Sequence, residues 1–318
     1  MTDTTYPTVA LPSEAKVVNV GLPLFEQAVR DQGASAVGVE WRIPAGGDAV
    51  VVAALARLLG PKAALIDTAN AEVVRRLNDG VPMLQGVETA GDVIPGMGDR
   101  TVLHCGPAIA WADMPDPLQR SIKAAVIAEG WATNVDGAAA LVDGGDVELR
   151  PANEHATVVP MATSIGPSAP VYVVNNAAGS KTAFSPINQG AGQVAWFGVD
   201  SDEAVDRLRF IRDAVGPVLA EAITSNGPID AFALASQGVP MGDDVHMRVQ
   251  ATTNLLLRDL LPHLVRSTHA EAGAVATFLS GNHLMFLNVA MAAAKSLVMW
   301  AGEVPNSSIV TTMARNGA

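Results

Sequence analysis

Apolar and polar residues follow one another in blocks, and near the amino terminus these blocks predict strands that alternate with helices. The apolar run KVVNVGL at residues 16–22 is typical of a buried strand, and Pro23 favours the first turn of a helix that ends at Gly33. Strands that alternate with helices predict right-handed crossovers and a parallel sheet, which we interpret as Rossmann-like. Further strands are predicted at 36–41 and 63–67, and further helices at 48–59 and 69–78.

Beyond residue 80 the pattern becomes mixed, and after residue 200 it becomes helical. The last apolar stretch, 284–301, has 18 residues and contains Asn288 and Lys295. Because a membrane span needs about 20 apolar residues, we interpret this stretch as a buried core helix. Strands are predicted at 101–104, 157–161, 171–175 and 193–197, and helices at 117–131, 202–225, 250–267 and 284–301.

These elements predict an α/β protein with three parts. The N-terminal part, residues 13–105, is the Rossmann-like parallel sheet, and residues 106–200 form a middle α+β unit. Residues 201–318 form a mainly helical C-terminal unit. The apolar share is 49% and the charged share only 16%, against about 25% charged residues in an average globular protein. So few charged residues cannot cover every face of the protein, which predicts a large core or subunit interfaces. We therefore expect a homo- or hetero-oligomer.

Charge and cysteine content narrow the possible functions. The net charge of −12 argues against nucleic acid and anionic membrane surfaces as partners, but it allows a small anionic substrate bound by local arginines and helix starts. Cys105 is the single cysteine, which excludes an internal disulfide and a cysteine zinc site. The N-terminus carries no signal-peptide pattern, so we expect a cytoplasmic protein. No G-x-G-x-x-G or P-loop motif follows a strand, and no cofactor is predicted.

Three short polar segments interrupt this apolar chain, and we take them as the candidate sites. They are PANEHATVVPM at 151–161, MGDDVHMR at 241–248 and SGNHLMFLN at 280–288, and they hold three of the six histidines. Buried polar groups are stable only when they are paired or used, so these segments are where chemistry is expected. In the first segment, His155 beside Glu154 is either a general base or acid, or a satisfied histidine at a strand edge.

The second and third segments each precede a predicted helix. Asp243 or Asp244 is a good N-cap for the helix that begins near residue 250, while Arg248 could bind a carboxylate or phosphate in bidentate fashion. With His246 the two aspartates could alternatively hold a divalent metal, although no metal is predicted. Asn282 precedes the apolar helix, whose free N–H groups favour an anion.

We therefore expect a single cavity to which His155, Arg248 and Asn282 contribute. The predicted catalytic residues are His155, His246, Glu154, Asp243 and Asp244. The predicted substrate-binding residues are Arg248, Asn282, His283, Arg315 and Asn316.

The chain also resembles a known family in a series of motifs that occur in order. They are WRIPAGG, LHCGPAIAW, AEGWA, NEHATVVPMAT, NQGAGQVAWFG, MGDDVHMR, FLSGN with FLNVAMAAAKS, and SSIVTTMARNG. From about Lys16 to its end the sequence is similar to the YlbE/AllG-type proteins, companions of FdrA-type proteins in purine-derived ureide catabolism. Two features differ: family members continue beyond the ARNG motif, so a truncated or divergent C-terminus is expected, and His283 stands where the family has Asp in a GND motif.

The resemblance implies a subunit of an oxamate carbamoyltransferase, a complex that interconverts oxalurate plus phosphate with oxamate plus carbamoyl phosphate in allantoin breakdown. In that hypothesis Arg248 and the helix start at Asn282 bind the anion, His155 acts on the amide nitrogen, and His246 polarises the carbamoyl carbonyl. Two alternatives are a non-catalytic partner of an FdrA-type subunit and a metal-dependent amidohydrolase that uses His155, His246 and His283.

Overall fold

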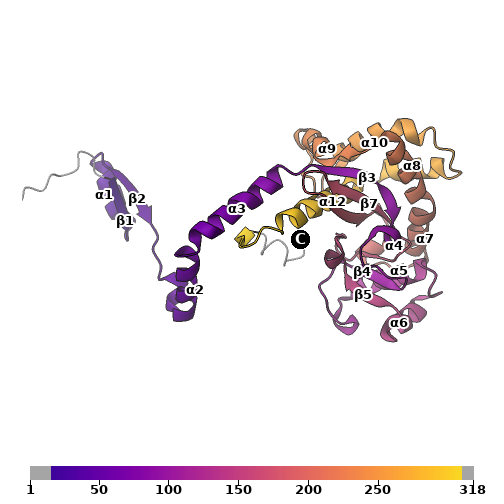
Figure 1. Ribbon diagram of the computed structural model, residues 1–318, viewed down its shortest axis with the longest axis horizontal. Coiled ribbons are helices and arrows are strands. Elements are labelled where there is room, and N and C mark those ends of the chain that lie inside the picture. Colours follow the sequence, from indigo (N-terminus) through magenta and orange to yellow (C-terminus); the bar gives the residue numbers. More distant parts are fainter. Residues whose placement is uncertain (1–15, 310–318) are drawn as a thin grey trace, which may run out of the picture. The chain divides into compact units, whose positions relative to one another are not determined.

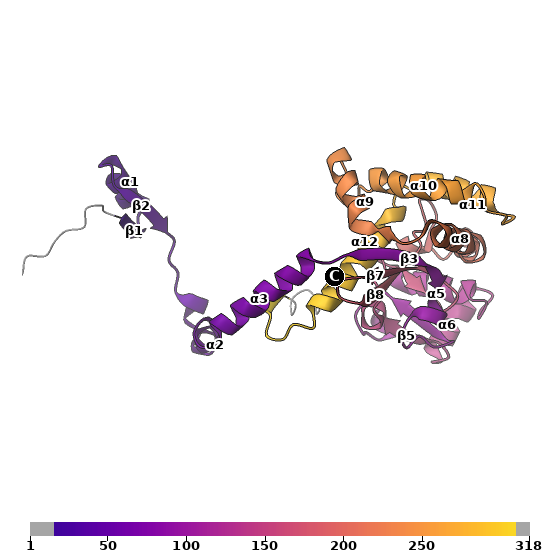
Figure 2. The ribbon, with the colours of Figure 1, turned by 45° about the horizontal axis from the view of Figure 1, so that its top comes forward.

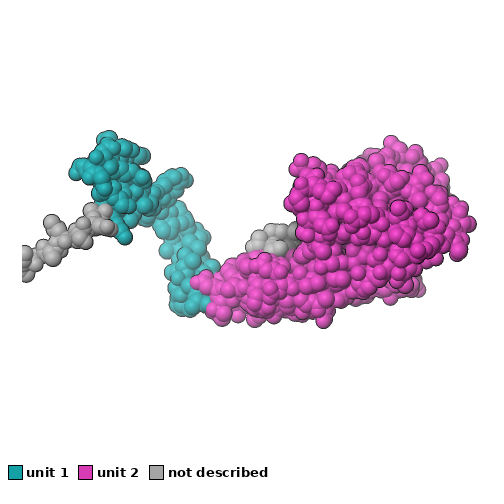
Figure 3. Space-filling model, turned by 90° about the horizontal axis from the view of Figure 1, so that it is seen from above, with its two compact units in different colours: residues 1–64 teal, residues 65–318 magenta. Residues whose placement is uncertain are grey.

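A computed structural model of the chain describes residues 16–309. It confirms a mixed α/β protein with a small parallel sheet near the N-terminus and a helical C-terminal region. The chain forms two compact units, Met1–Ala64 and Leu65–Ala318 (Figure 3). The predicted boundaries after residues 105 and 200 both fall inside the second unit, and the three-part division stays a prediction.

The first unit contains the predicted β–α–β arrangement. Its strands pair in parallel, with Val18 opposite Val37. Pro23 occupies the first turn of the first helix, as expected from its fixed φ, and the Asp48 carboxylate caps the next helix by accepting two backbone N–H groups. The elements are β1 (Lys16–Val20), α1 (Pro23–Asp31), β2 (Ser35–Val39) and α2 (Ala49–Leu59).

Three predicted strands are wrong. Residues 63–67 open the helix α3 (Ala63–Asn78), because a short apolar run has no period of its own and Ala and Leu favour helix. Residues 193–197 contain a 3-10 turn between Gly192 and Gly198, whose φ angles are +101° and +76°. The predicted strand at 157–161 is reduced to a single bridge from Thr157.

The second unit contains two sheets. The larger has the order β8-β7-β3-β9, and all of its neighbouring strands are antiparallel. The smaller has the order β5-β4-β6, with β4 and β5 parallel and β4 and β6 antiparallel. The strands are β3 (Pro82–Thr89), β4 (Thr101–His104), β5 (Glu148–Pro151), β6 (Ser164–Ile165), β7 (Pro170–Asn176), β8 (Lys181–Pro186) and β9 (Ile229–Asp230).

The two sheets pack on each other, and helices cover their outer faces. Along β7, Tyr172 and Val174 point into a helical core, while Val171 faces Leu103 of the other sheet. The neighbouring Val102 faces the opposite helical layer. Figures 1 and 2 show α8 and α10 on one side of β3 and β7, with α5 and α6 on the other side. These helices are α5 (Asp116–Ala128), α6 (Val135–Asp143), α8 (Gly216–Asn226) and α10 (Gln250–Leu264).

The C-terminal region is helical as predicted. The expected helix at 202–225 is α7, which continues through a π-helical turn at Ile211–Val215 into α8. The apolar stretch forms α12, which packs on β7 and β8 and buries ten of its residues, so the prediction of a core helix is confirmed. The remaining helices are α4 (Ala90–Val93), α7 (Asp202–Phe210), α9 (Ala231–Gly238), α11 (Ala272–Gly281) and α12 (Met285–Ala301).

Within residues 16–309, no single helix has both the length and the apolar character needed to cross a membrane. Two bent pairs, α2 with α3 and α11 with α12, pass the same test on length and composition alone.

Candidate functional site

Asn282 lies between α11 and α12 and is almost fully buried, with 2% of its surface exposed. Its side-chain Nδ2 donates a hydrogen bond of 2.8 Å to the carbonyl oxygen of Asn188. The Oδ1 atom has no hydrogen-bond partner in the described part of the chain. Because a buried polar atom without a partner is costly, this oxygen is a candidate acceptor for a ligand.

A network of buried amides fixes this region. Asn188 donates from Nδ2 to Oδ1 of Asn288 at 3.0 Å, and Asn288 donates in turn to the Ser185 hydroxyl at 3.1 Å. Asn188 Oδ1 also accepts the backbone N–H of Gly190 at 3.0 Å. The network ties the loop after β8 to α12, so that the position of Asn282 is set by segments about a hundred residues apart in sequence.

A cavity of about 400 Å³ lies beside Asn282, and Arg207 on α7 lines it. The guanidinium of Arg207 stands 5.7 Å from the ring centre of Phe278, and its Nη1 donates to the Gln189 carbonyl at 3.1 Å. Arg207 forms no ion pair with a carboxylate of the described residues, whereas Arg209 pairs with a neighbouring aspartate. An arginine without an acidic partner is available to a ligand anion.

Gly190 brings the parts of this cavity together. Its φ of +78° is in the left-handed region, which glycine adopts without strain. A Cβ at this position would lie 3.5 Å from Arg207 Nη1, 3.5 Å from Phe278 Cε2 and 3.9 Å from Asn282 Cγ. The cavity therefore offers a cation and a buried carbonyl acceptor across a glycine. We define it as the Arg207–Asn282 pocket.

The segment 241–248 lies at the surface and satisfies its own polar groups. The Asp243 carboxylate accepts the backbone N–H groups of Ala251 and Thr252, at 3.1 and 2.6 Å, and the Thr252 hydroxyl at 2.8 Å. It therefore caps the start of α10, which the sequence offered as one of two interpretations.

Asp244 organises the turn that follows. Its carboxylate accepts the backbone N–H groups of His246 and Arg248, at 2.9 and 2.8 Å, and pairs with the Arg248 guanidinium at 3.2 Å. These bonds lower the pKa of Asp244 to about 2, and the two backbone N–H groups contribute more to the shift than the Arg248 side chain does. The Arg248 side chain is 75% exposed, and His246 is exposed as well.

The segment 151–161 follows β5, at the carboxyl ends of the parallel strands β4 and β5. His155 is buried and its Nδ1 donates to the Pro95 carbonyl at 2.7 Å, so a neutral ring leaves Nε2 free to accept a proton. Glu154 is exposed. Lys295 on α12 donates to the Asn153 carbonyl at 3.0 Å, and burial lowers the pKa of Lys295.

His104 ends β4 next to this segment. Its Nδ1 accepts the backbone N–H of Gly106 at 3.1 Å, which places the proton of the neutral ring on Nε2. Burial lowers the pKa of His104, and the nearby Glu154 carboxylate opposes that shift. The Cys105 thiol accepts the backbone N–H of Ala162, and burial raises its pKa.

The structure brings some predicted site residues together and not others. Asn282 lines the Arg207–Asn282 pocket, but His155 and Arg248 do not. Thr253 on α10, the helix that follows the second segment, contacts the third segment: its hydroxyl donates to the carbonyl of the exposed His283 at 3.1 Å. Within residues 16–309 no three His, Cys, Asp or Glu side chains are grouped as metal ligands. The predicted residues Arg315 and Asn316 lie outside the described residues.

Sequence reasoning missed Arg207 and Gly190. Arg207 lies four residues after Glu203, a spacing that indicates an ordinary helix-surface ion pair rather than a ligand site. The loop NQGAGQ, which contains Gly190, did carry a signal: glycines within a polar loop between a strand and a helix favour close approach of a backbone.

Residues 147–318 match the family described as the oxamate carbamoyltransferase subunit AllG. The chain is 34% identical over 253 residues to the subunit AllG of Escherichia coli, which covers 78% of this chain and 60% of that protein. It is 31% identical over 304 residues to the uncharacterized protein YahG of the same organism, which covers 95% of this chain and 64% of YahG. The chain thus spans less than two thirds of the length of both relatives.

A solved structure is also similar, a conserved protein of unknown function from Enterococcus faecalis. It has a TM-score of 0.74 and 32% sequence identity, and the match covers 76% of this chain and 59% of the other. The family match covers more than half of this chain, and all three polar segments fall within it. The chain belongs to the family of the oxamate carbamoyltransferase subunit AllG.

Proposed function

We propose that this chain is a subunit of an oxamate carbamoyltransferase-like complex, which interconverts oxalurate plus phosphate with oxamate plus carbamoyl phosphate. Family membership supports the proposal. The observation that carries it is the Arg207–Asn282 pocket. There an arginine stands beside a buried carbonyl oxygen, and among residues 16–309 the arginine has no acidic partner and the oxygen no hydrogen-bond donor. Oxamate and oxalurate combine a carboxylate with amide N–H groups, and these are the two features such a pocket would bind.

In this proposal the Arg207 guanidinium binds the substrate carboxylate and Asn282 Oδ1 accepts an amide N–H. A phosphate oxygen attacks the ureido carbonyl carbon of oxalurate. The bond from that carbon to the oxamate nitrogen breaks, and this nitrogen takes up a proton as oxamate leaves. The proton-transfer role of His155 and the carbonyl-polarising role of His246 stay predictions.

The test is phosphorolysis of oxalurate by the chain co-expressed with its genomic neighbours, read as carbamoyl phosphate formed. Asn282→Ala is expected to lower the rate at least about ten-fold. The variant loses the Oδ1 acceptor for the substrate amide N–H, and it also loses the hydrogen bond from Nδ2 to the Asn188 carbonyl. Asn254→Ala, at an exposed position on α10, is the matched control and is expected to keep the full rate. An unchanged rate with Asn282→Ala would remove the pocket from the proposal.

A second candidate function is that of a non-catalytic partner of an FdrA-type subunit. The matched family is named as a subunit, and the first unit favours a partner because Ala36 is its only buried residue among 16–64. Its parallel strands expose Val18 and Val37 at 67% and 57%, although parallel sheets are usually covered on both faces. If the chain is such a partner, the purified chain alone should not catalyse oxalurate phosphorolysis, and activity should appear when it is mixed with the FdrA-type subunit. The predicted cytoplasmic location and oligomeric state belong to this proposal.

A further inference from the structure

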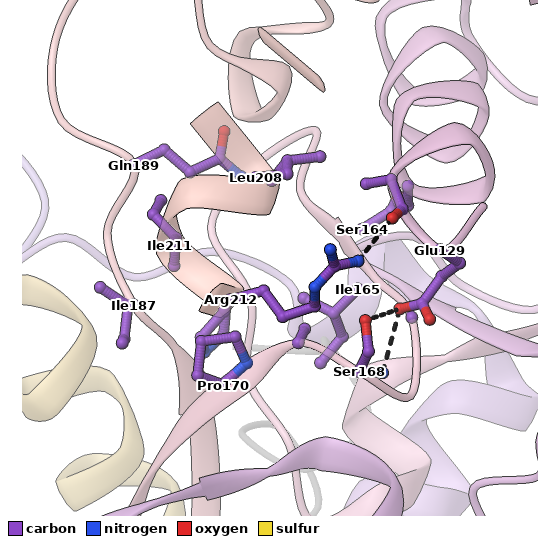
Figure 4. Close-up of a pocket in the computed structure, with 15 residues that line it drawn as sticks. Glu129, Ser164, Ile165, Ser168, Pro170, Ile187, Gln189, Leu208, Ile211 and Arg212 are labelled. Carbon is purple, nitrogen blue, oxygen red and sulfur yellow. Dashed lines mark hydrogen bonds between the residues drawn. The ribbon is translucent and has the colours of Figure 1, made fainter. Parts of the chain in front are cut away.

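A small second cavity lies at the C-terminal end of α5, and its polar walls come from three segments. Its volume is about 40 Å³, and Glu129, Ser164, Ser168 and Arg212 line it (Figure 4). A water molecule needs about 10–15 Å³ of such volume, so the cavity has room for about three waters or for one molecule of three or four heavy atoms. None of the sequence-predicted site residues lines it.

Glu129 is held in a fixed orientation on one side of the cavity. Its Oε1 accepts the backbone N–H of Ser168 at 3.0 Å and the Ser168 hydroxyl at 2.8 Å. A Cβ on Gly166 would lie 2.2 Å from that Oε1, so only glycine allows the carboxylate to lie here. The second oxygen, Oε2, accepts no hydrogen bond from the described residues. Figure 4 shows the Glu129 side chain across from Arg212, and Oε2 is the acceptor atom of this lining side chain that remains for a ligand.

Arg212 supplies donors on the other side. Its Nε and Nη2 donate to Asp213 at 2.6 and 2.9 Å, and its Nη1 donates to the Ala128 carbonyl at 2.7 Å. A guanidinium has five N–H donors, so two of them remain after these bonds. Arg212 is neutralised by Asp213 and forms no ion pair with Glu129. Because Asp213 balances the charge of Arg212, an ionised Glu129 gives the cavity a net negative charge. This charge disfavours a carboxylate ligand.

Ser164 provides the independent sign of a ligand. It is 3% exposed and lines the cavity, yet its hydroxyl has no hydrogen-bond partner in the described part of the chain. A buried hydroxyl without a partner is destabilising unless something occupies the space next to it. Three kinds of hydrogen-bonding group therefore line one cavity. Glu129 Oε2 is an acceptor, Arg212 has two remaining donors, and the Ser164 hydroxyl can act as either.

We propose that this cavity binds a small uncharged primary amide. The amide N–H groups donate to Glu129 Oε2 and to the Ser164 hydroxyl, and the amide carbonyl accepts from Arg212. The site is separate from the Arg207–Asn282 pocket, and the inference goes beyond the proposed function. A substituent on the amide would pass Arg212 and Ser168 into a neighbouring groove of about 400 Å³, which both residues also line.

The test is a ligand-observed NMR titration of the full chain with acetamide, with acetate and methylammonium as charged analogues of similar size. Acetamide is expected to bind more tightly than either analogue. The negative charge of the cavity disfavours acetate, and methylammonium has no acceptor for the Arg212 donors. Ser164→Ala is expected to weaken acetamide binding about five-fold, the loss typical of one neutral hydrogen bond. Glu129→Gln is expected to weaken it at least as much, because the amide NH₂ can replace the Oε2 acceptor by a donor.

Ser121→Ala is the matched control. Ser121 is also a buried serine whose hydroxyl lacks a partner in the described residues, but it does not line the cavity. Neither serine variant removes a hydrogen bond of the folded chain, so both are expected to unfold at or above the wild-type temperature. Equal acetamide binding by wild type and Ser164→Ala, or equal binding of acetamide and acetate, would overturn the proposal. Because acetamide carries no carboxylate and no turnover is measured, this result is independent of the oxalurate assay.

Discussion

Two polar segments, 280–288 and 241–248, look alike in sequence but are used differently in the structure. Each combines His with Asn or Asp just before a helix. In the first, Asn282 is buried and belongs to an amide network. Within the described residues its Oδ1 has no partner, and the neighbouring Arg207 has no carboxylate partner. In the second, Asp243 and Asp244 are saturated by local backbone N–H groups at the surface. The comparison teaches that an unsatisfied buried atom, rather than polar composition, identifies a candidate ligand site and separates it from a helix cap.

The largest expected effect separates the two arginines. Arg207→Ala should weaken oxamate binding about 10- to 100-fold, because a hydrogen bond to a charged group contributes about 1.5–3 kcal/mol. Arg248→Ala should leave binding unchanged, because that side chain is 75% exposed and already paired with Asp244. Isothermal titration calorimetry with oxamate measures both. The reverse result, with binding lost only in Arg248→Ala, would move the anion site to the segment 241–248.

A change at Asp243 should affect stability and not binding. Asp243→Ala is expected to lower the free energy of unfolding by about 1–2 kcal/mol, because it removes the acceptor for the first N–H groups of α10. Urea denaturation measures the loss, and Asp243→Asn should lose less because it keeps an acceptor oxygen. Wild-type stability with lost oxamate binding would instead show Asp243 to be a ligand residue.

Gly190→Ala should lower both the stability of the fold and the affinity for oxamate. Its φ of +78° makes any side chain there cost about 1 kcal/mol of stability, and the new methyl group would project into the pocket beside Arg207. Gly192→Ala is the matched control, since its φ is +101° and a Cβ there meets nothing within 4 Å. Both variants should lose similar stability in urea, but only Gly190→Ala should also lose oxamate affinity. Equal affinity in the two variants would argue against a ligand next to Gly190.

The smallest effect is a pH dependence in the segment 241–248. The folded state lowers the pKa of Asp244 from 3.8 to about 2, so its carboxylate stabilises the fold above about pH 4, and that contribution is lost as the pH falls towards 2. The stability difference between wild type and Asp244→Asn should therefore be larger at pH 6 than at pH 2.5. A difference that does not change with pH would show that the carboxylate charge has no role in this turn.

The sequence predicted elements well where a long period or a cap was present. The helix stripes after residue 200 and the Pro23 start are found as expected, because one amphipathic face repeats over many turns. Short apolar runs failed, as at 63–67, because their neighbours decide between strand and helix. The strands β3 and β8 went unpredicted. The pairing of β3 with β7 joins segments far apart in sequence, which no local pattern indicates.

For the site, the sequence by itself determined the family and pointed to Asn282 as one of ten candidates, because motifs and polar residues in apolar surroundings can be read locally. Only the tertiary structure decided which candidate atoms lack partners. Hydrogen bonds such as that from Asn188 to Asn288 join positions 100 residues apart, and the packing of α7 on the loop after β8 places Arg207 beside Asn282. Satisfaction of a polar group depends on such distant neighbours, so it could not be deduced from the order of residues alone.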